Sequence, residues 1–179
     1  MKHFTFAIIF LFLIVISACK NEQKSMQDHI STQEKSLFSA NSKTQLNNKQ
    51  AIDLIAQYTA FAQKFPNEST TPEYLFKKAE LQTAIQQFQS SIDTYQQLFE
   101  TYKNFDKRPQ ALFLQAFVYE NYLKNNAKAR EIYQQFLTSF PNDDFADDAK
   151  ASIEYIDQGL SAEDLVKKFQ ENLEKQKKQ

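Results

Sequence analysis

The sequence predicts an all-α fold. Only one Gly and four Pro occur in 179 residues, and no Asn-Gly turn is present to join strands into hairpins. Good helix formers, chiefly Gln, Lys, Glu, Ala and Leu, fill much of the chain. An aromatic content of 14%, with 17 Phe and 8 Tyr, is enough for a packed core. We therefore expect long helices joined by short turns.

Residues 1–18 have the composition of a secretory leader. A short basic start, Lys2 and His3, precedes residues 4–16, which are apolar apart from Thr5. This run is shorter than the roughly 20 residues needed to span a bilayer, and its length is typical of a cleaved leader. The run ends in the sequence Ile-Ser-Ala-Cys at residues 16–19.

The end of the leader resembles the bacterial lipobox, an aliphatic residue followed by two small residues and a Cys. The resemblance implies cleavage before Cys19, a diacylglyceryl group on its thiol and acylation of the new amine. One acyl chain gives only marginal membrane attachment, so a durable anchor needs several. Lys20, in place of an Asp, favours the outer membrane in well-studied Gram-negative sorting. The alternative is a plain leader that leaves Cys19 as a free thiol.

Residues 19–47 are expected to form the lipidated Cys and a flexible tether. The segment is rich in Gln, Lys, Asn, Ser and Thr, and its scattered apolar residues keep no sustained helical period. A flexible chain of this length reaches about 30 Å, enough to lift a domain off the lipid headgroups. The alternative is that the pair Leu37 and Phe38 docks on the domain or on a partner.

An internal repeat organises residues 48–158. Three successive copies of one pattern carry the repeat, and aligned positions of the copies form its columns. The copies are Tyr58, Phe61, Phe65 and Pro66, then Tyr95, Leu98 and Tyr102, then Tyr133, Phe136, Phe140 and Pro141. The three leading Tyr residues lie 37 and 38 residues apart. Ala79, Ala116 and Glu154 align on the same offsets. A fixed period of this length predicts stacked helical repeats.

These columns resemble the tetratricopeptide repeat (TPR), a pair of antiparallel helices with small residues at their crossing. Ala129, Tyr133, Phe136 and Pro141 stand at the small, aromatic, packing and terminal positions of that family. The resemblance implies a TPR-like α-solenoid of about three helix pairs over residues 48–158. Residues 159–179 would form a C-terminal capping helix with a basic tail, because terminal repeats must shield the open end of a stack.

Local signals predict seven helices from residue 48 onward. The signals for helix starts are an Asn cap near residue 48, a capping box at residues 70–73, Pro109, the acidic residues 143–148 and a Ser cap at residue 161. Gly159 is the signal for a helix end. The first helix places Ile52, Ile55, Tyr58 and Phe61 on one face, as an amphipathic helix requires.

The family resemblance also implies a binding groove. First helices of TPR units line the concave face, which commonly receives a peptide or partner segment. In this register the groove residues are Phe76, Glu80, Phe113, Phe117, Glu120 and Tyr155. The alternative for Phe113 and Phe117 is core packing, because residues 111–119 are apolar almost all round.

The composition argues against several chemistries. The two His residues, His3 and His29, lie in the leader and the expected tether, so no catalytic residue, metal site or cofactor is expected. One Gly cannot build a phosphate-binding loop, which argues against nucleotides. A net charge of −1 gives no field to attract nucleic acid. The acidic residues 143–148 lack the ligand spacing and Gly of a calcium loop.

The expected function is a non-enzymatic, lipid-anchored scaffold in the bacterial cell envelope, on the outer membrane and facing the periplasm. Its partner would be another envelope protein or peptide in the groove. The chain resembles the repeat lipoprotein of the outer-membrane β-barrel assembly machine, which implies a role in outer-membrane protein assembly. Two alternatives remain: an envelope or division adaptor like the Tol–Pal-associated periplasmic TPR protein, and a peptidoglycan enzyme or its activator.

Overall fold

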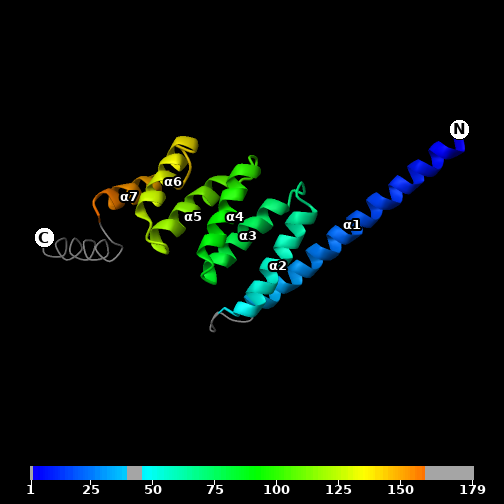
Figure 1. Cartoon of the computed structure of the whole chain (residues 1–179), viewed down its shortest axis with the longest axis horizontal. Coiled ribbons are helices and arrows are strands. Elements are labelled where there is room, and N and C mark those ends of the chain that lie inside the picture. Colours follow the sequence, from blue (N-terminus) through cyan, green and yellow to red (C-terminus); the bar gives the residue numbers. More distant parts are fainter. Residues whose placement is uncertain (1, 40–45, 160–179) are drawn as a thin grey trace. The chain divides into compact units, whose positions relative to one another are not determined.

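The structure is a computed structural model that describes residues 2–39 and 46–159. Its elements are α1 (Lys2–Ser39), α2 (Asn48–Lys64), α3 (Thr71–Ala84), α4 (Phe88–Thr101), α5 (Arg108–Asn121), α6 (Asn126–Ser139) and α7 (Ala146–Asp157) (Figure 1). Within these residues every regular element is an α-helix, which confirms the predicted all-α fold class. No helix in the described ranges is both long enough and apolar enough to cross a bilayer.

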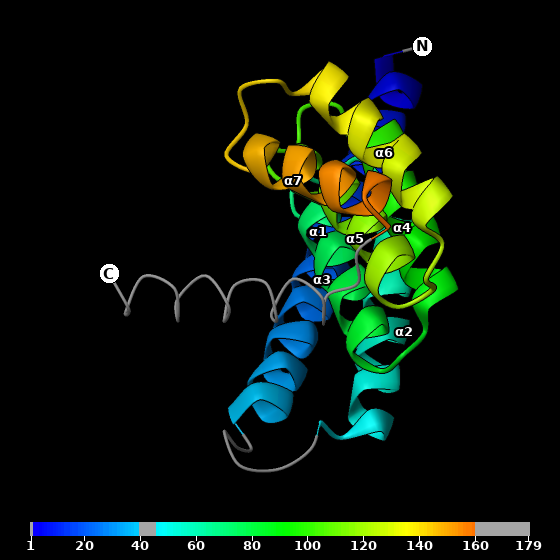
Figure 2. The same ribbon diagram turned by 90° about the vertical axis from the view of Figure 1, so that its left-hand side faces the viewer.

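The chain divides into two compact units, residues 1–87 and residues 88–179. In the first unit, α2 packs against both α1 and α3. Figure 2 shows α2 running back alongside α1. In the second unit, α4 packs on α5, α5 on α6, and α6 on α7. Each unit is therefore a run of consecutive helices, each packed on the next.

The expected flexible tether is helical in the structure. Residues 20–39 continue α1 and pack on α2. Met26, Ile30 and Leu37 lie four and seven residues apart, which places them on one side of a helix. The Ile30 side chain has 0% of its surface exposed, and Leu37 is also buried. Leu37 therefore docks on the domain, as the alternative prediction for the pair Leu37 and Phe38 states. Its neighbour Phe38 is 64% exposed.

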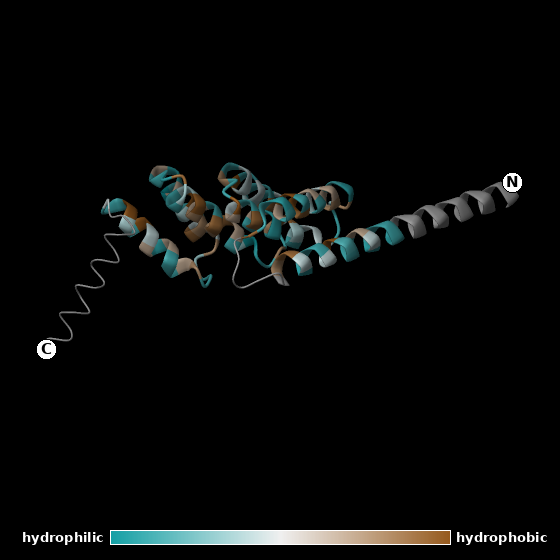
Figure 3. Ribbon diagram, turned by 90° about the horizontal axis from the view of Figure 1, so that it is seen from below, coloured by the Kyte–Doolittle hydropathy of each residue, from teal (hydrophilic) through white to brown (hydrophobic). Residues whose placement is uncertain are grey.

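The helix formed by residues 20–39 of α1 was not predicted because this segment is mostly polar. Figure 3 shows the described part of α1 as largely hydrophilic, with few hydrophobic residues. Partners outside α1 satisfy some of these polar groups: Gln27 donates a 3.2 Å hydrogen bond to the hydroxyl of Thr70, and Glu34 accepts one from Tyr58. A period search that counts only apolar residues therefore undercounts the packed face of α1.

The first unit has its own hydrophobic core. Its buried members are Ile30, Leu37, Ala51, Leu54, Tyr58, Phe61, Phe65 and Leu81. The ring of Tyr74 on α3 stacks on Tyr58 at 5.5 Å between centroids and meets Phe61 edge-on at 4.9 Å. Offset and edge-to-face ring pairs of this kind add about 0.5–1.5 kcal/mol beyond area burial. Tyr58, Phe61 and Phe65, the aromatic residues of the first copy of the sequence repeat, are thus core residues.

The second unit has a larger core, built on α5 and α6. Its buried members are Phe99, Leu112, Phe113, Ala116, Ala129, Ile132, Tyr133, Phe136, Ala146 and Ala149. Three Ala residues of this core, Ala116, Ala129 and Ala149, are completely buried. The burial of Ala116 and Ala129 agrees with their place at small-residue positions of the sequence repeat.

Several predicted helix ends are confirmed. Pro72 and Pro109 lie in the first turns of α3 and α5, where a missing N–H costs nothing. Acidic Asp147 and Asp148 occupy the first turn of α7. Gly159 takes a φ of 65°, the left-handed conformation expected after a helix. The seventh predicted helix, from residue 161, lies outside the described residues.

The capping box predicted at residues 70–73 is not formed. The Thr70 side chain makes no capping hydrogen bond to α3 and instead accepts one from Gln27 of α1. The hydroxyl of Thr71 donates to the Phe65 carbonyl at 2.5 Å. Tertiary partners have replaced the local cap, and they tie the start of α3 to the rest of the first unit.

Candidate functional site

The six predicted groove residues fall into both units of the chain. Phe76 and Glu80 lie on α3, in the first unit. Phe113, Phe117 and Glu120 lie on α5, and Tyr155 on α7, in the second unit.

Phe113 is a core residue. Its side chain is only 8% exposed. Its ring stacks on Phe145 at 4.8 Å and contacts Tyr133 at 5.4 Å and Phe136 at 5.9 Å. Phe76 is likewise buried. These two aromatic side chains support the helices and leave little surface for a partner, so core packing, the alternative left open for Phe113, describes its position.

Phe117 lies at the surface and belongs to an aromatic patch formed by Phe88, Phe117 and Tyr122. Phe117 is 37% exposed, and Tyr122 and Leu123 are also exposed. Tyr122 stacks on Phe88 at 4.6 Å and meets Phe117 edge-on at 6.1 Å. Of this patch, only Phe117 was predicted to be a binding residue. The contacts of Phe88 and Tyr122 depend on α4 and α5 lying together, which local sequence does not reveal.

Glu120 has a structural partner. Its carboxylate accepts a 2.9 Å hydrogen bond from the hydroxyl of Tyr133. Burial of the phenol, together with the nearby negative charge of Glu120, raises the pKa of Tyr133 far above its usual value. Tyr155 on α7 is half-buried. Glu120 therefore links α5 to α6 within the second unit.

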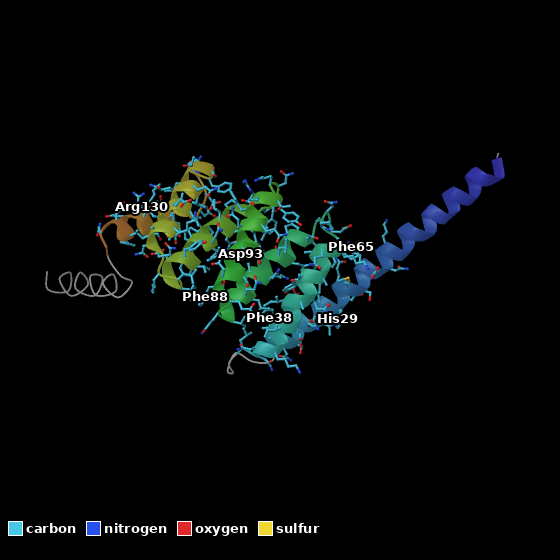
Figure 4. The ribbon with its side chains drawn as sticks, viewed as in Figure 1. His29, Phe38, Phe65, Phe88, Asp93 and Arg130 are labelled. Carbon is cyan, nitrogen blue, oxygen red and sulfur yellow. The ribbon has the colours of Figure 1, made fainter. Side chains whose placement is uncertain are left out.

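The first unit contains an open apolar pocket of about 320 Å³ between α1, α2 and α3, which we call the α1–α3 pocket. Its lining residues are Phe38, Leu46, Tyr58, Lys77, Glu80, Leu81 and Ala84. Phe38 contributes a large exposed ring from the end of α1, and Figure 4 labels it there. An apolar concavity with a few polar groups at its edge is the usual form of a binding pocket.

A charged network stands beside the α1–α3 pocket. The Glu34 carboxylate accepts a 2.7 Å hydrogen bond from the Tyr58 hydroxyl and a 2.9 Å bond from the Lys77 ammonium. Burial, and then the hydrogen bond to Glu34, raise the pKa of Tyr58 far above its usual value. The network holds α1, α2 and α3 together where the pocket forms.

Only Glu80 among the pocket residues was predicted as a site residue. The other lining residues escaped prediction because the pocket needs α1, which was expected to be a tether. The pair Leu37 and Phe38 was the available signal: two consecutive large apolar residues in a polar segment. In the structure, the first is buried in the core and the second lines the pocket.

The second unit contains a polar pocket of about 300 Å³ between α4, α5 and α6. Its lining residues are Ile92, Asp93, Gln96, Gln115, Tyr119, Lys128, Glu131, Ile132 and Gln135. Gln115 is 4% exposed, and its Nε2 donates a 2.8 Å hydrogen bond to Gln96 Oε1. The Oε1 atom of Gln115 has no hydrogen-bond partner. The Lys128 ammonium donates to Glu131 at 2.7 Å. The chemistry of this pocket is hydrogen bonding by amides and a compact ion pair.

Metal-ligating residue types do not gather in the described part of the chain. No group of three or more His, Cys, Asp or Glu side chains there is placed to hold a metal ion. His29 shares a 3.1 Å hydrogen bond with Gln33 on the same helix. The acidic residues at the start of α7 serve local structure: Asp143 accepts from the Phe145 N–H at 3.0 Å.

Comparison with known families identifies the repeats. Residues 73–104 and 110–143 match the tetratricopeptide repeat family. The first segment spans nearly all of α3 and the whole of α4, and the second spans most of α5 and the whole of α6. The match supports the predicted TPR character of the chain and its assignment as a helical-repeat protein, a class that generally binds protein partners. A comparison with curated proteins found no match.

Proposed function

We propose, on the premise that residues 73–104 and 110–143 are tetratricopeptide repeats, that this chain is a non-catalytic scaffold that binds another protein of the bacterial cell envelope. The observation that carries the proposal is the open α1–α3 pocket, part of whose lining comes from the first repeat segment, residues 73–104. Helical-repeat proteins of this class generally bind protein partners, and binding pockets are typically apolar with a few polar groups. An apolar side chain of the partner would enter between Phe38 and Leu81.

The proposal includes a lipid anchor on Cys19. Its support is the basic start, the apolar run and the Ile-Ser-Ala-Cys sequence in which the run ends. The residue after Cys19, a Lys, favours the outer membrane, with the repeats on the periplasmic side. We further propose that the scaffold serves the assembly of outer-membrane proteins. This proposal rests on the resemblance of the chain to the repeat lipoprotein of the outer-membrane β-barrel assembly machine.

The anchor is tested by growing cells with labelled palmitate. The full-length protein should incorporate the label and fractionate with the outer membrane, whereas Cys19→Ser should do neither. Incorporation into the Cys19→Ser protein, or none into the natural one, would refute the anchor.

The binding site is tested by photo-crosslinking in living cells. A crosslinking residue at Phe38 or Ala84, in the α1–α3 pocket, should capture one envelope protein reproducibly. The same residue at Gln63, an exposed position on α2 outside the pocket, is the matched control. Equal capture from Gln63, or none from the pocket, would argue against the site.

A substitution separates binding from folding. Phe38→Ser should abolish capture from Ala84 and leave the helical content unchanged, because the Phe38 ring is mostly exposed. The natural protein and Phe38→Ser should therefore give the same circular dichroism spectrum. Undiminished capture by Phe38→Ser would place the partner elsewhere.

A further inference from the structure

The segment that follows Cys19 makes contacts along its whole length. Three residues after Cys19, Glu22 forms an ion pair with Lys64 at the end of α2. Gln27 bonds Thr70 at the start of α3, and Ile30 is completely buried. Further along, Glu34 bonds Tyr58 and Lys77. Tertiary contacts therefore hold α1 to the first unit at intervals from Glu22 to Glu34.

These contacts fix which end of the first unit lies beside Cys19. Lys64 and Thr70 bracket the connection between α2 and α3, residues 65–70, which we call the α2–α3 loop. Figure 4 labels Phe65 at this end of the first unit and Phe38 at the opposite end of α1. A helix rises 1.5 Å per residue, so Glu22 stands about 5 Å from Cys19 along α1, and Phe38 about 28 Å.

From this geometry we propose that the α2–α3 loop faces the lipid headgroups, and that α1 holds the α1–α3 pocket at its far end, about 28 Å along the helix from Cys19. The inference rests on the proposed lipid anchor at Cys19. It replaces a tether of about 30 Å reach with a helix that sets both distance and orientation of the first unit. The partner of this surface is the bilayer itself.

The chemistry of this end suits a headgroup layer. The α2–α3 loop carries one acidic residue, the half-buried Glu68, while its exposed residues Pro66, Asn67 and Ser69 are uncharged. Lys20 and Lys24, both exposed, lie four residues apart on the same side of α1. An anionic membrane surface attracts Lys side chains that lie close to it.

The inference is tested with a fluorophore placed at each end of the unit. Cys19 is the only cysteine and its thiol would carry the lipid, so an introduced cysteine is the single site for a thiol label. Asn67→Cys labels the α2–α3 loop, and Ser36→Cys, also exposed, labels the far end of α1. The full lipidated proteins are inserted in vesicles of phosphatidylethanolamine and phosphatidylglycerol with a nitroxide on the headgroups.

Quenching should be several-fold stronger for the label at residue 67 than for the label at residue 36. Equal quenching in protein that incorporates labelled palmitate would overturn the orientation and leave the lipid anchor intact. Failure to incorporate palmitate would instead refute the anchor, and the inference with it. Quenching stronger at residue 36 would show the opposite orientation and overturn the proposal.

A matched variant tests whether α1 causes the orientation. A flexible Gly-Ser insertion of about 12 residues between Lys20 and Asn21 adds about 20 Å of reach while leaving every described contact of α1 in place. The difference between the two labels should then disappear. If the difference persists with the insertion, another surface holds the unit to the membrane and the role assigned to α1 is wrong.

Discussion

The hydroxyl of Tyr58 on α2 donates a 2.7 Å hydrogen bond to the carboxylate of Glu34 on α1. The second unit repeats the arrangement, where Tyr133 on α6 donates to Glu120 on α5 at 2.9 Å. Tyr58 and Tyr133 occupy the same column of the sequence repeat. The end of α1 therefore packs on α2 in the same role as α5 on α6. In the first unit it serves as the first helix of a helix pair.

Removing the acceptor from α1 should destabilise the first unit. Glu34→Ala leaves the buried Tyr58 hydroxyl without its partner and breaks the bond to Lys77. Hydrogen bonds to charged groups contribute about 1.5–3 kcal/mol, so we expect a loss of about 1–3 kcal/mol in the free energy of unfolding. A urea titration followed by circular dichroism measures the loss, and hydrogen exchange should become faster along residues 22–38.

Glu22→Ala is the matched control for Glu34→Ala. The Glu22 and Lys64 side chains are about half exposed, and exposed ion pairs contribute less than about 1 kcal/mol. An equal cost for the two substitutions would show that the Tyr58 and Glu34 bond has no special weight in joining α1 to α2.

Alkaline pH should weaken the second unit through Tyr133. Burial and Glu120 raise the pKa of this phenol in the folded state, while in the unfolded chain it ionises near pH 10. Above about pH 10 the unfolded state therefore binds fewer protons. The free energy of unfolding should then fall by about 1.4 kcal/mol per pH unit for this one tyrosine.

Tyr133→Phe tests the alkaline effect directly. The slope of unfolding free energy against pH above pH 10 should be shallower by about 1.4 kcal/mol per unit than in the natural protein. Between pH 7 and 9 the two slopes should coincide, because Tyr133 stays protonated in both states. Parallel slopes above pH 10 would contradict the raised pKa of Tyr133.

Alanine at Phe113 and at Phe117 should have unequal effects on stability. Phe113→Ala removes a ring that packs on Tyr133, Phe136 and Phe145, and should cost about 3–5 kcal/mol. Phe117→Ala should cost about 1 kcal/mol or less, because much of this ring is already exposed. Thermal unfolding of the two variants measures the difference, and equal melting temperatures would contradict the assignment of Phe113 to the core.

The helix cap at Asn125 should be worth a measurable amount. Its side chain accepts a 3.1 Å hydrogen bond from the Lys128 N–H at the start of α6. Asn125→Ala should lower the free energy of unfolding by about 1 kcal/mol, while Asn125→Asp should retain most of the stability because Asp also caps. If the Asp variant loses as much as the Ala variant in urea, the cap is not the cause.

Much of the fold was predictable because it depends on local or periodic signals. The scarcity of Gly predicted helices, and the Tyr58, Tyr95 and Tyr133 column predicted buried aromatic positions, all three of which are buried. Pro72 and Pro109 marked helix starts correctly. These signals act within one turn or one repeat, so they survive without knowledge of the neighbouring helices.

The candidate site was much less predictable. Phe76 and Phe113 were placed in a groove by family register, yet both are buried. Of the α1–α3 pocket, Glu80 was predicted as a groove residue, and Phe38 entered only through the alternative that it docks on the domain or a partner. A helix has several faces, and the sequence around Phe113 is apolar on nearly all of them, so neighbouring helices must decide which face is covered.

By itself, the sequence determined an all-helical repeat protein, its helix starts from residue 48 onward and its buried aromatic columns. Only the tertiary structure decided that residues 20–39 belong to the first unit. The physical reason lies in the composition of that helix face. Three apolar residues are too few to predict burial, whereas bonds from Gln27 and Glu34 to Thr70, Tyr58 and Lys77 exist only once α2 and α3 are in place.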